Sequence, residues 1–346
     1  MVNKKRLVFI LRIFAAIAVI TSLVVFVPWK LVWPWLAPLP DTVQEQLEDA
    51  IGHGFDGIVV YVDRAGEEPA FYSAGWKNRA EQIPADPHSL FKIASIGKLY
   101  EAVSIAKLVH DGRLSLDKTL IDYFPELEGR IQYADSITLK MMVQHRSGIP
   151  SFTEHPGFWS TEFQNDDEVL ELALDLPALF EPGEDYHYSN TNYFLISRLI
   201  ERVSGDSEQQ FIRERILEPL ELENTFGSIH EVNLDDLMSG YYVGIEEDIK
   251  STDYDSMIAT AEDVGIFLRA LNDGSLFEEG EQEIYSSIYV YEHTGLIPGY
   301  QSIARYHPDI DTVVIQFNNT TDFSDYTNWV LGEIVYGRVL KILRRQ

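Results

Sequence analysis

The hydrophobic pattern first sets apart the N-terminal segment. An almost unbroken apolar run covers residues 7–27, follows basic residues at 4–6 and is interrupted by Arg12. A bilayer crossing takes about 20 residues, so this run is long enough to span a membrane. A cleaved signal peptide has the same basic start and apolar core, but no convincing small-residue cleavage site follows, and prolines at 34, 38 and 40 crowd the region. We therefore expect residues 1–40 to be an uncleaved anchor with an interfacial linker.

The flanking residues predict the orientation of this anchor. Basic residues before the run favour a cytoplasmic N-terminus, and tryptophans at 29, 33 and 35 are typical of the opposite membrane interface. The remainder of the chain is thus expected on the extracytoplasmic side, in a periplasm or outside the cell.

Beyond residue 40 the pattern changes from strands to helices and back. β-branched and aromatic residues at 57–62 and 70–74 predict a hairpin, and apolar residues spaced by three and four predict a helix over 96–110. Further helices are predicted over 138–145, 167–174, 192–203, 261–271 and 329–343, and strands over 288–291, 301–307 and 311–317.

This order predicts an α+β fold, with an antiparallel sheet flanked by helices and a helical insertion. We expect one domain over 41–346, with a sheet subdomain from 41–110 and 285–346 and a helical subdomain from 111–284.

Composition excludes several classes of function. The 55 acidic against 27 basic residues give a net charge of −28, and no acidic residue lies within residues 1–40. Such a surface repels phosphate backbones, so nucleic acid is not an expected partner. Adaptation to salty surroundings and ordinary export both remain compatible with the charge. Cysteine is absent and the nine histidines show no ligand spacing, so neither a metal nor another cofactor is expected.

A serine three residues before a lysine can place hydroxyl and amine on one helix face, and a desolvated lysine can accept the serine proton. Four such pairs occur, beginning at Ser89, Ser95, Ser104 and Ser115. Ser104 lies inside a predicted helix, while Ser89 and Ser115 lie in loop or turn regions. Ser95 alone stands at a helix start, where free N–H groups can stabilise negative charge. Ser95 with Lys98 is therefore the candidate nucleophile and base, although a serine cap beside a solvated lysine is the simpler alternative for any single match.

Two further motifs carry suitable chemistry. Tyr188-Ser189-Asn190 follows a Pro-Gly turn and precedes a helix, so a phenol that can move protons and an amide that can orient lysine or substrate project from a loop. His293-Thr294-Gly295 ends the strand predicted over 288–291 and could bind substrate, with the N–H of Leu296 as an oxyanion donor.

The ordered set Ser95-x-x-Lys98, Tyr188-x-Asn190 and His293-Thr294-Gly295 resembles the three signatures of the superfamily of class C β-lactamases, DD-peptidases and related esterases. Flanking stretches at 114–117, 143–150, 260–263 and 293–299 are similar to its recurring segments, and the resemblance covers roughly residues 50 to 343.

The resemblance implies an acyl-enzyme route. Ser95 would attack a carbonyl while Lys98 and Tyr188 transfer protons, and the N–H groups of Ser95 and Leu296 would hold the oxyanion. Asn190, His293, Thr294 and Gly295 would form the substrate-binding residues. The expected substrate is an exported ester or amide: a D-amino-acid peptide, a small ester or a β-lactam.

One departure from the family changes the expected substrate. His293 stands where β-lactamases usually have lysine, which is similar to the DD-peptidase and esterase branches, so we expect slow β-lactam hydrolysis. A catalytically weak penicillin-binding sensor or scaffold of the same fold is the alternative. Oligomeric state is not predicted.

Overall fold

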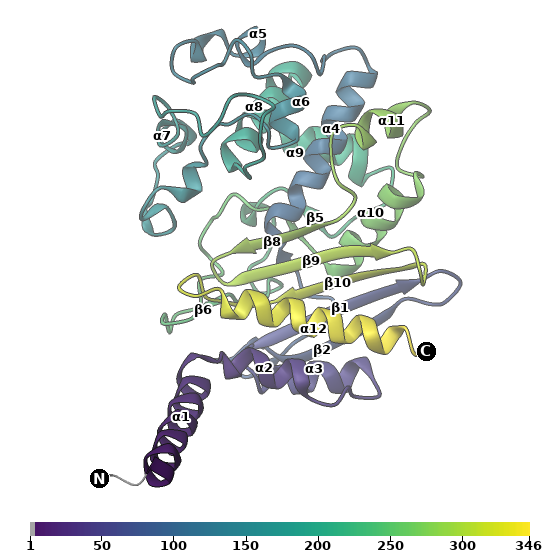
Figure 1. Ribbon diagram of the computed structural model, residues 1–346. Coiled ribbons are helices and arrows are strands. Elements are labelled where there is room, and N and C mark those ends of the chain that lie inside the picture. The colour runs from purple at the N-terminus through teal and green to yellow at the C-terminus, as the bar shows by residue number, and fades with distance from the viewer. Residues whose placement is uncertain (1–3) are drawn as a thin grey trace.

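The alternation of side chains along β1 (Gly57–Arg64) explains its place at the centre of the main sheet. The computed structural model describes residues 4–346 and shows a six-stranded antiparallel sheet (Figure 1). The strand order is β3 (Ile83–Pro84), β2 (Ala70–Asn78), β1, β10 (Thr312–Asn318), β9 (Tyr300–His307) and β8 (His293–Ile297). The sheet thus joins strands from both ends of the chain, since Tyr61 of β1 pairs with Ile315 of β10.

Successive residues of β1 enter two different cores, as the twofold period of a strand requires. Ile58, Val60 and Val62 pack with α3 (Val43–Ile51) and α12 (Thr327–Leu343) on one face. Val59 and Tyr61 belong to the larger core on the other face, with α4 (Gly97–His110) and α10 (Ala261–Asp273). Gly265 allows α10 to approach closely, because a Cβ at that position would lie 2.2 Å from the ring of Tyr61.

The helical region lies on the side of the sheet opposite α12, and α4 runs from the sheet into it (Figure 1). Its helices are α5 (Leu120–Tyr123), α6 (Leu139–Val143), α7 (Asp166–Glu171), α8 (Asn190–Ser204), α9 (Glu208–Ile212) and α11 (Glu281–Ser286). Side-chain caps define several starts: Thr138, Asn165 and Thr260 accept backbone N–H bonds at α6, α7 and α10.

Short elements complete the fold. A three-stranded sheet has the order β4 (Phe91–Lys92), β7 (Ile258–Ala259) and β5 (Thr225–Phe226), and β11 (Thr320–Thr321) pairs in parallel with β6 (Tyr241–Tyr242). The remaining turns are η1 (Ala94–Ile96), η2 (Pro125–Leu127), η3 (Phe152–Glu154), η4 (Phe158–Ser160), η5 (Arg213–Leu217) and η6 (Ile229–Glu231).

The predicted α+β class with its antiparallel sheet and helical insertion is confirmed, while the subdomain boundaries stay a prediction. The strand predicted over residues 288–291 is wrong. The N–H groups of Ile288 and Tyr289 donate to the carbonyl of Tyr285, so they form a turn after α11 and cannot join a ladder. The sheet strand begins at His293, and residues 293–295 therefore open β8 rather than end the preceding strand.

The apolar N-terminal run forms α1 (Lys4–Phe26), which projects from the body of the protein (Figure 1). Its segment Val8–Phe26 has a mean hydropathy of 2.6, is wholly unburied and is long enough to cross a membrane. The next helix, α2 (Trp29–Leu36), leads to a fixed junction, because the guanidinium of Arg338 on α12 donates to the carbonyls of Ala37 and Pro38 at 2.8 Å.

Candidate active site

Ser95 lies in η1, directly before α4, at the edge of a large cavity. The preceding residue Ala94 has a φ of +51°, in the left-handed region that costs a non-glycine residue roughly 1–2 kcal/mol. The neighbouring structure holds this turn in place. The N–H of Ala94 donates to Ser256 Oγ at 2.9 Å, and the carbonyl of Ile93 accepts from Ser302 Oγ on β9 at 2.8 Å. The strained backbone therefore presents Ser95 from a turn that is fixed on both sides.

Lys98 lies on the same cavity wall, about one helical turn after Ser95. Its Nζ donates to Asn190 Oδ1 at 2.9 Å and lies 5.3 Å from the ring centre of Tyr188. Asn190 Nδ2 in turn donates to Thr153 Oγ1 at 2.9 Å, which fixes the amide with its oxygen toward the lysine. The N–H of Asn190 donates to Ser151 Oγ at 3.0 Å. The start of α8 thus fixes Asn190, and Asn190 in turn holds the Nζ of Lys98 in a defined position.

Tyr188 lines the same cavity, and its ring stacks on His145 with the ring centres 4.3 Å apart. His145 Nδ1 accepts the N–H of Ser189 at 3.1 Å. Burial, followed by the charge of Lys98, lowers the pKa of His145 to about 3, so the imidazole is neutral. The hydroxyl of Tyr188 is buried and has no hydrogen-bond partner among residues 4–346. A buried unpartnered phenol on a cavity wall is available to a reacting group.

His293 is held by the protein through both ring nitrogens. Nδ1 donates to the carbonyl of Thr294 at 2.6 Å, and Nε2 accepts the hydroxyl of Tyr289 at 3.0 Å. Burial and then the charge of Lys98 lower the pKa of His293 to about 4. Because the ring is neutral and both nitrogens are engaged, it offers no positive charge to a substrate carboxylate.

The first residues of β8 pack against the turn that carries Ser95. A Cβ on Gly295 would lie 2.5 Å from the carbonyl oxygen of Ile93 and 2.9 Å from Ala94 Cβ, so only glycine fits there. Its neighbours Thr294 and Leu296 line the cavity. β8 is an outer strand that, within residues 4–346, pairs only with β9, so alternate N–H groups point away from the ladder on its other edge.

The cavity has a volume of about 1550 Å³ and brings together most of the residues predicted from the sequence. Those on its wall are Ser95, Lys98, Tyr188, Asn190, His293, Thr294 and Leu296, while Gly295 lies behind it. Of the four serines that precede a lysine by three residues, only Ser95 is on this wall. Ser104 is buried and donates to the carbonyl of Tyr100.

Sequence reasoning missed the residues that support these groups. His145 lay in the stretch noted for its resemblance, without a role, and Tyr289 was assigned to a strand that does not form. Ser151 and Thr153 had no signal in the sequence, because their contacts with Asn190 span 39 and 37 residues.

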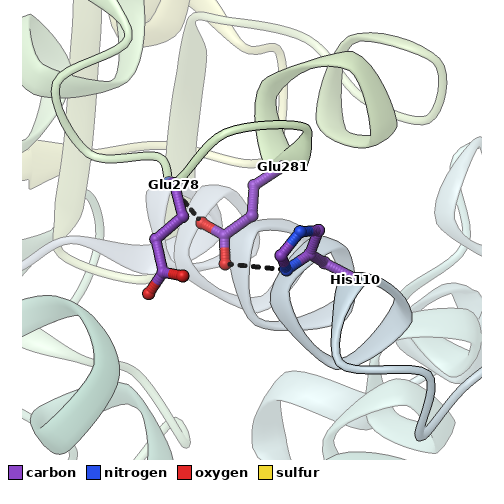
Figure 2. Close-up of side chains that lie close together, drawn as sticks. All are labelled: His110, Glu278 and Glu281. Atoms are coloured by element: carbon purple, nitrogen blue, oxygen red, sulfur yellow. Dashed lines mark hydrogen bonds and ion pairs between the residues drawn. The ribbon is translucent and has the colours of Figure 1, made fainter.

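One group of side chains within residues 4–346 could hold a metal, although the sequence predicted none. The ligand atoms of His110, Glu278 and Glu281 lie within 4.8 Å of one another at the far end of α4 (Figure 2). Glu281 is buried and already accepts Lys107 Nζ at 2.7 Å. The ammonium group repels a cation at the same carboxylate, so the geometry favours a buried ion pair that links α4 to α11. None of these residues lines the large cavity.

With this geometry described, the comparisons with known proteins identify the family. The protein family described as "Beta-lactamase" matches residues 41–288 of this chain. The chain belongs to the beta-lactamase family. This finding confirms the resemblance drawn from the three motifs, and it assigns no role to individual residues.

Characterised relatives in this beta-lactamase family match only part of the chain. Protein flp of Staphylococcus aureus strain MW2 is 25% identical over 193 residues, which are 54% of this chain and 39% of that protein. Penicillin-binding protein 4* of Bacillus subtilis strain 168 is 27% identical over 177 residues, or 50% and 38%. The match thus spans about two fifths of the length of these relatives.

Solved structures of the same fold match almost end to end. D-amino acid amidase from Ochrobactrum anthropi SV3, in complex with L-phenylalanine amide, has a TM-score of 0.75 at 23% identity and covers 88% of this chain and 97% of its own. A penicillin binding protein from Bacillus halodurans has a TM-score of 0.72 at 21% identity, covering 87% and 98%. At these identities the likeness establishes the β-lactamase-type serine hydrolase fold.

Proposed function

We propose that this protein is a membrane-anchored serine hydrolase that forms an acyl-enzyme through Ser95. The observation that carries the proposal is the single cavity wall shared by Ser95, Lys98 and Tyr188, with Lys98 Nζ held at 2.9 Å from Asn190 Oδ1. They supply a nucleophile, a base that can accept its proton and a phenol that can pass protons on, which together can support acyl transfer.

In the proposed reaction, Ser95 Oγ attacks the carbonyl carbon of an ester or amide while its proton passes to the unprotonated amine form of Lys98, with Tyr188 in the transfer path. The N–H groups of Ser95 and Leu296 stabilise the oxyanion. The tetrahedral intermediate collapses, and the leaving alcohol or amine takes up the proton. Water then attacks the acyl ester, which returns Ser95 to its hydroxyl form.

Asn190 and Thr294 are the proposed substrate-binding residues that face the cavity, and Gly295 contributes indirectly because it allows β8 to lie against the turn that carries Ser95. His293 also borders the cavity. Since both of its nitrogens are engaged, we assign it to holding the start of β8 in place and to neutral contact with substrate.

Amides and small esters are the proposed substrates, ahead of β-lactams. The amidase of the same fold binds a phenylalanine amide, which supports an amide substrate. Because His293 is neutral, it does not attract the carboxylate of a β-lactam, and binding of that substrate is weaker. Nitrocefin is therefore expected to turn over more slowly than p-nitrophenyl esters and D-Ala-D-Ala peptides under one condition, and a nitrocefin rate far above the others would reverse this ranking.

The test of the nucleophile is covalent labelling of the detergent-solubilised full chain with a fluorescent phosphonate or penicillin. Wild type should be labelled and Ser95→Ala should not, whereas Ser251→Ala, an exposed serine on the same cavity, should behave as wild type. Unchanged labelling of Ser95→Ala would remove it from the nucleophile role. Absence of labelling and turnover in wild type would favour the sensor or scaffold alternative.

We further propose that α1 anchors the protein with its N-terminus in the cytoplasm and the catalytic part outside. The exposed apolar helix supports an anchor, and it would equally serve as a signal sequence. An alkaline phosphatase fusion after residue 40 should be active, and an inactive fusion would reverse the orientation. The intact mass of the mature protein should retain residues 1–40, and a shortened mass would establish cleavage.

A further inference from the structure

A pair of glutamates lies in the same cavity, beyond Lys98, and takes no part in the mechanism above. Glu101 is on α4, three residues after Lys98, and Glu208 is the first residue of α9. Both line the cavity. Helical spacing places Ser95, Lys98 and Glu101 in succession along one face of the chain, about one turn apart.

Each glutamate has a carboxyl oxygen without a hydrogen-bond partner. Glu208 is only 8% exposed; its Oε2 accepts Ser197 Oγ at 2.7 Å, but its Oε1 is buried without a partner among residues 4–346. Glu101 Oε2 is likewise buried without a partner in that part of the chain. The two carboxyl groups contact each other, so a shared proton or a bound cation is needed to hold the pair together without repulsion.

The charged residues around Glu101 and Glu208 do not supply that cation. Burial is the largest cause that raises the pKa of both carboxyls, and it brings Glu208 to about 7. Asp255 also lines the cavity and raises both pKa values further. The charge of Lys98 on this wall partly offsets the rise in the pKa of Glu101, but its ammonium group donates to Asn190.

The two arginines on the cavity wall are also engaged elsewhere. Arg198 pairs with Asp166 and Asp167, and Arg213 pairs with Glu231. This end of the cavity is therefore an acidic recess, lined by the two glutamates and Asp255.

We propose that Glu101 and Glu208 form a subsite for a primary ammonium group on the acyl part of the substrate. An ammonium has three donors and a full positive charge, so it can satisfy both unpartnered oxygens at once. The inference rests on the proposed hydrolase function and names the substrate class within it: amino-acyl esters or amides, and not plain aliphatic ones.

The position of the pair selects the distance between ammonium and carbonyl. Glu101 lies six residues after Ser95, which is about 9 Å along the helix at 1.5 Å per residue. An extended chain advances roughly 1.2 Å per bond, and the glutamate side chain reaches part of the way. An amine about six bonds from the reacting carbonyl spans the gap, whereas an α-amino group lies too close to the carbonyl. The preferred acyl group is therefore lysine-like in length.

The competing explanation is a proton shared between the two carboxyls, with no role in binding. Two p-nitrophenyl esters of equal chain length separate the explanations: 6-aminohexanoate carries the ammonium, and heptanoate has a methyl group in its place. For wild type at pH 7.5 we expect kcat/KM to be about 10- to 100-fold higher for the amino ester, the range of a hydrogen bond to a charged group.

Glu208→Gln and Glu101→Gln each should reduce this preference at least several-fold. Glu162→Gln, an exposed acid on the same cavity wall, should keep it. The measured quantity is a ratio of two substrates in one preparation, so partial unfolding of a variant does not change it. Equal kcat/KM for the two esters in wild type, or a preference that survives in both glutamine variants, would overturn the subsite.

A binding measurement separates this result from the fate of the hydrolase proposal. In Ser95→Ala, calorimetry should show 6-aminohexanamide binding about 10-fold more tightly than heptanamide. Equal affinities overturn the subsite even if both esters are hydrolysed. Failure of wild type to hydrolyse either ester would refute the hydrolase, while tighter binding of the amine would still support the subsite.

Discussion

Replacing Gly295 by alanine tests whether the contact between β8 and the Ser95 turn controls activity. The added Cβ would lie 2.3 Å from Ser302 Oγ and 2.5 Å from the carbonyl oxygen of Ile93. The serine hydroxyl could rotate away, but the carbonyl belongs to the backbone and already accepts that hydroxyl at 2.8 Å. The clash therefore has to be relieved by moving β8 away from η1.

The size of that movement gives the expected magnitudes. Restoring an ordinary contact of about 3.5 Å to the Ile93 oxygen needs a shift of roughly 1 Å. Overpacking of this kind costs about 1–3 kcal/mol of unfolding free energy. A 1 Å misplacement of reacting groups can cost about 100-fold in rate, so kcat/KM should fall much more than stability.

The assay is p-nitrophenyl ester hydrolysis by the full chain in detergent, together with urea denaturation. Gly337→Ala is the matched control, since nothing lies within 4 Å of the added Cβ inside α12. Alanine there should leave activity unchanged and add up to about 1 kcal/mol of stability. Wild-type kcat/KM and wild-type stability in Gly295→Ala would refute the argued contact between β8 and the turn.

Three further outcomes are expected. Asn190→Ala removes the acceptor of Lys98 Nζ, and kcat/KM should fall about 10- to 100-fold in ester hydrolysis with little change in the urea midpoint. Because the folded-state pKa of His145 is about 3 against 6.5 for the free side chain, protonation favours the unfolded chain. Its contribution is complete above pH 6.5 and should decrease by about 2 kcal/mol between pH 6.5 and 5 in urea titrations. Glu281→Gln leaves Lys107 charged and buried, and the unfolding free energy should fall by about 3–5 kcal/mol.

A control variant can contradict each of these three predictions. Thr161→Ala, on the exposed cavity rim, should not reproduce the Asn190 effect. His145→Gln should flatten the acid dependence, and an unchanged slope would mean that other groups cause it. Glu278→Gln, exposed and close to Glu281, should change stability by less than about 0.5 kcal/mol, and equal losses in the two variants would argue against the buried pair.

The proposed catalytic groups differed in how far the sequence could predict their environment. Ser95 was separable from three similar serines because a helix start has free N–H groups, a local property. The hydrogen bond from Lys98 to Asn190 spans 92 residues, and no local pattern contains that distance. His293 was expected to contact substrate, whereas the fold engages both of its nitrogens.

The error at residues 288–291 shows why local pattern is insufficient. These residues have the composition of a strand, but α11 ends at Ser286, and Tyr285 in its last turn accepts the N–H groups of Ile288 and Tyr289. Residues with the same intrinsic preference at 57–64 do form a strand, because β2 and β10 are present on both sides.

By itself, the sequence determined the apolar N-terminal helix, most of the elements, the family and the candidate nucleophile. The family follows from the resemblance of three motifs to known signatures, and the rest from periodicity, capping and short spacings, which act within a few residues along the chain. Only the tertiary structure decided that Tyr188 stacks on His145 and that Glu101 and Glu208 share one recess. Such contacts join distant parts of the chain and are selected by packing and by the cost of leaving buried polar groups unpaired.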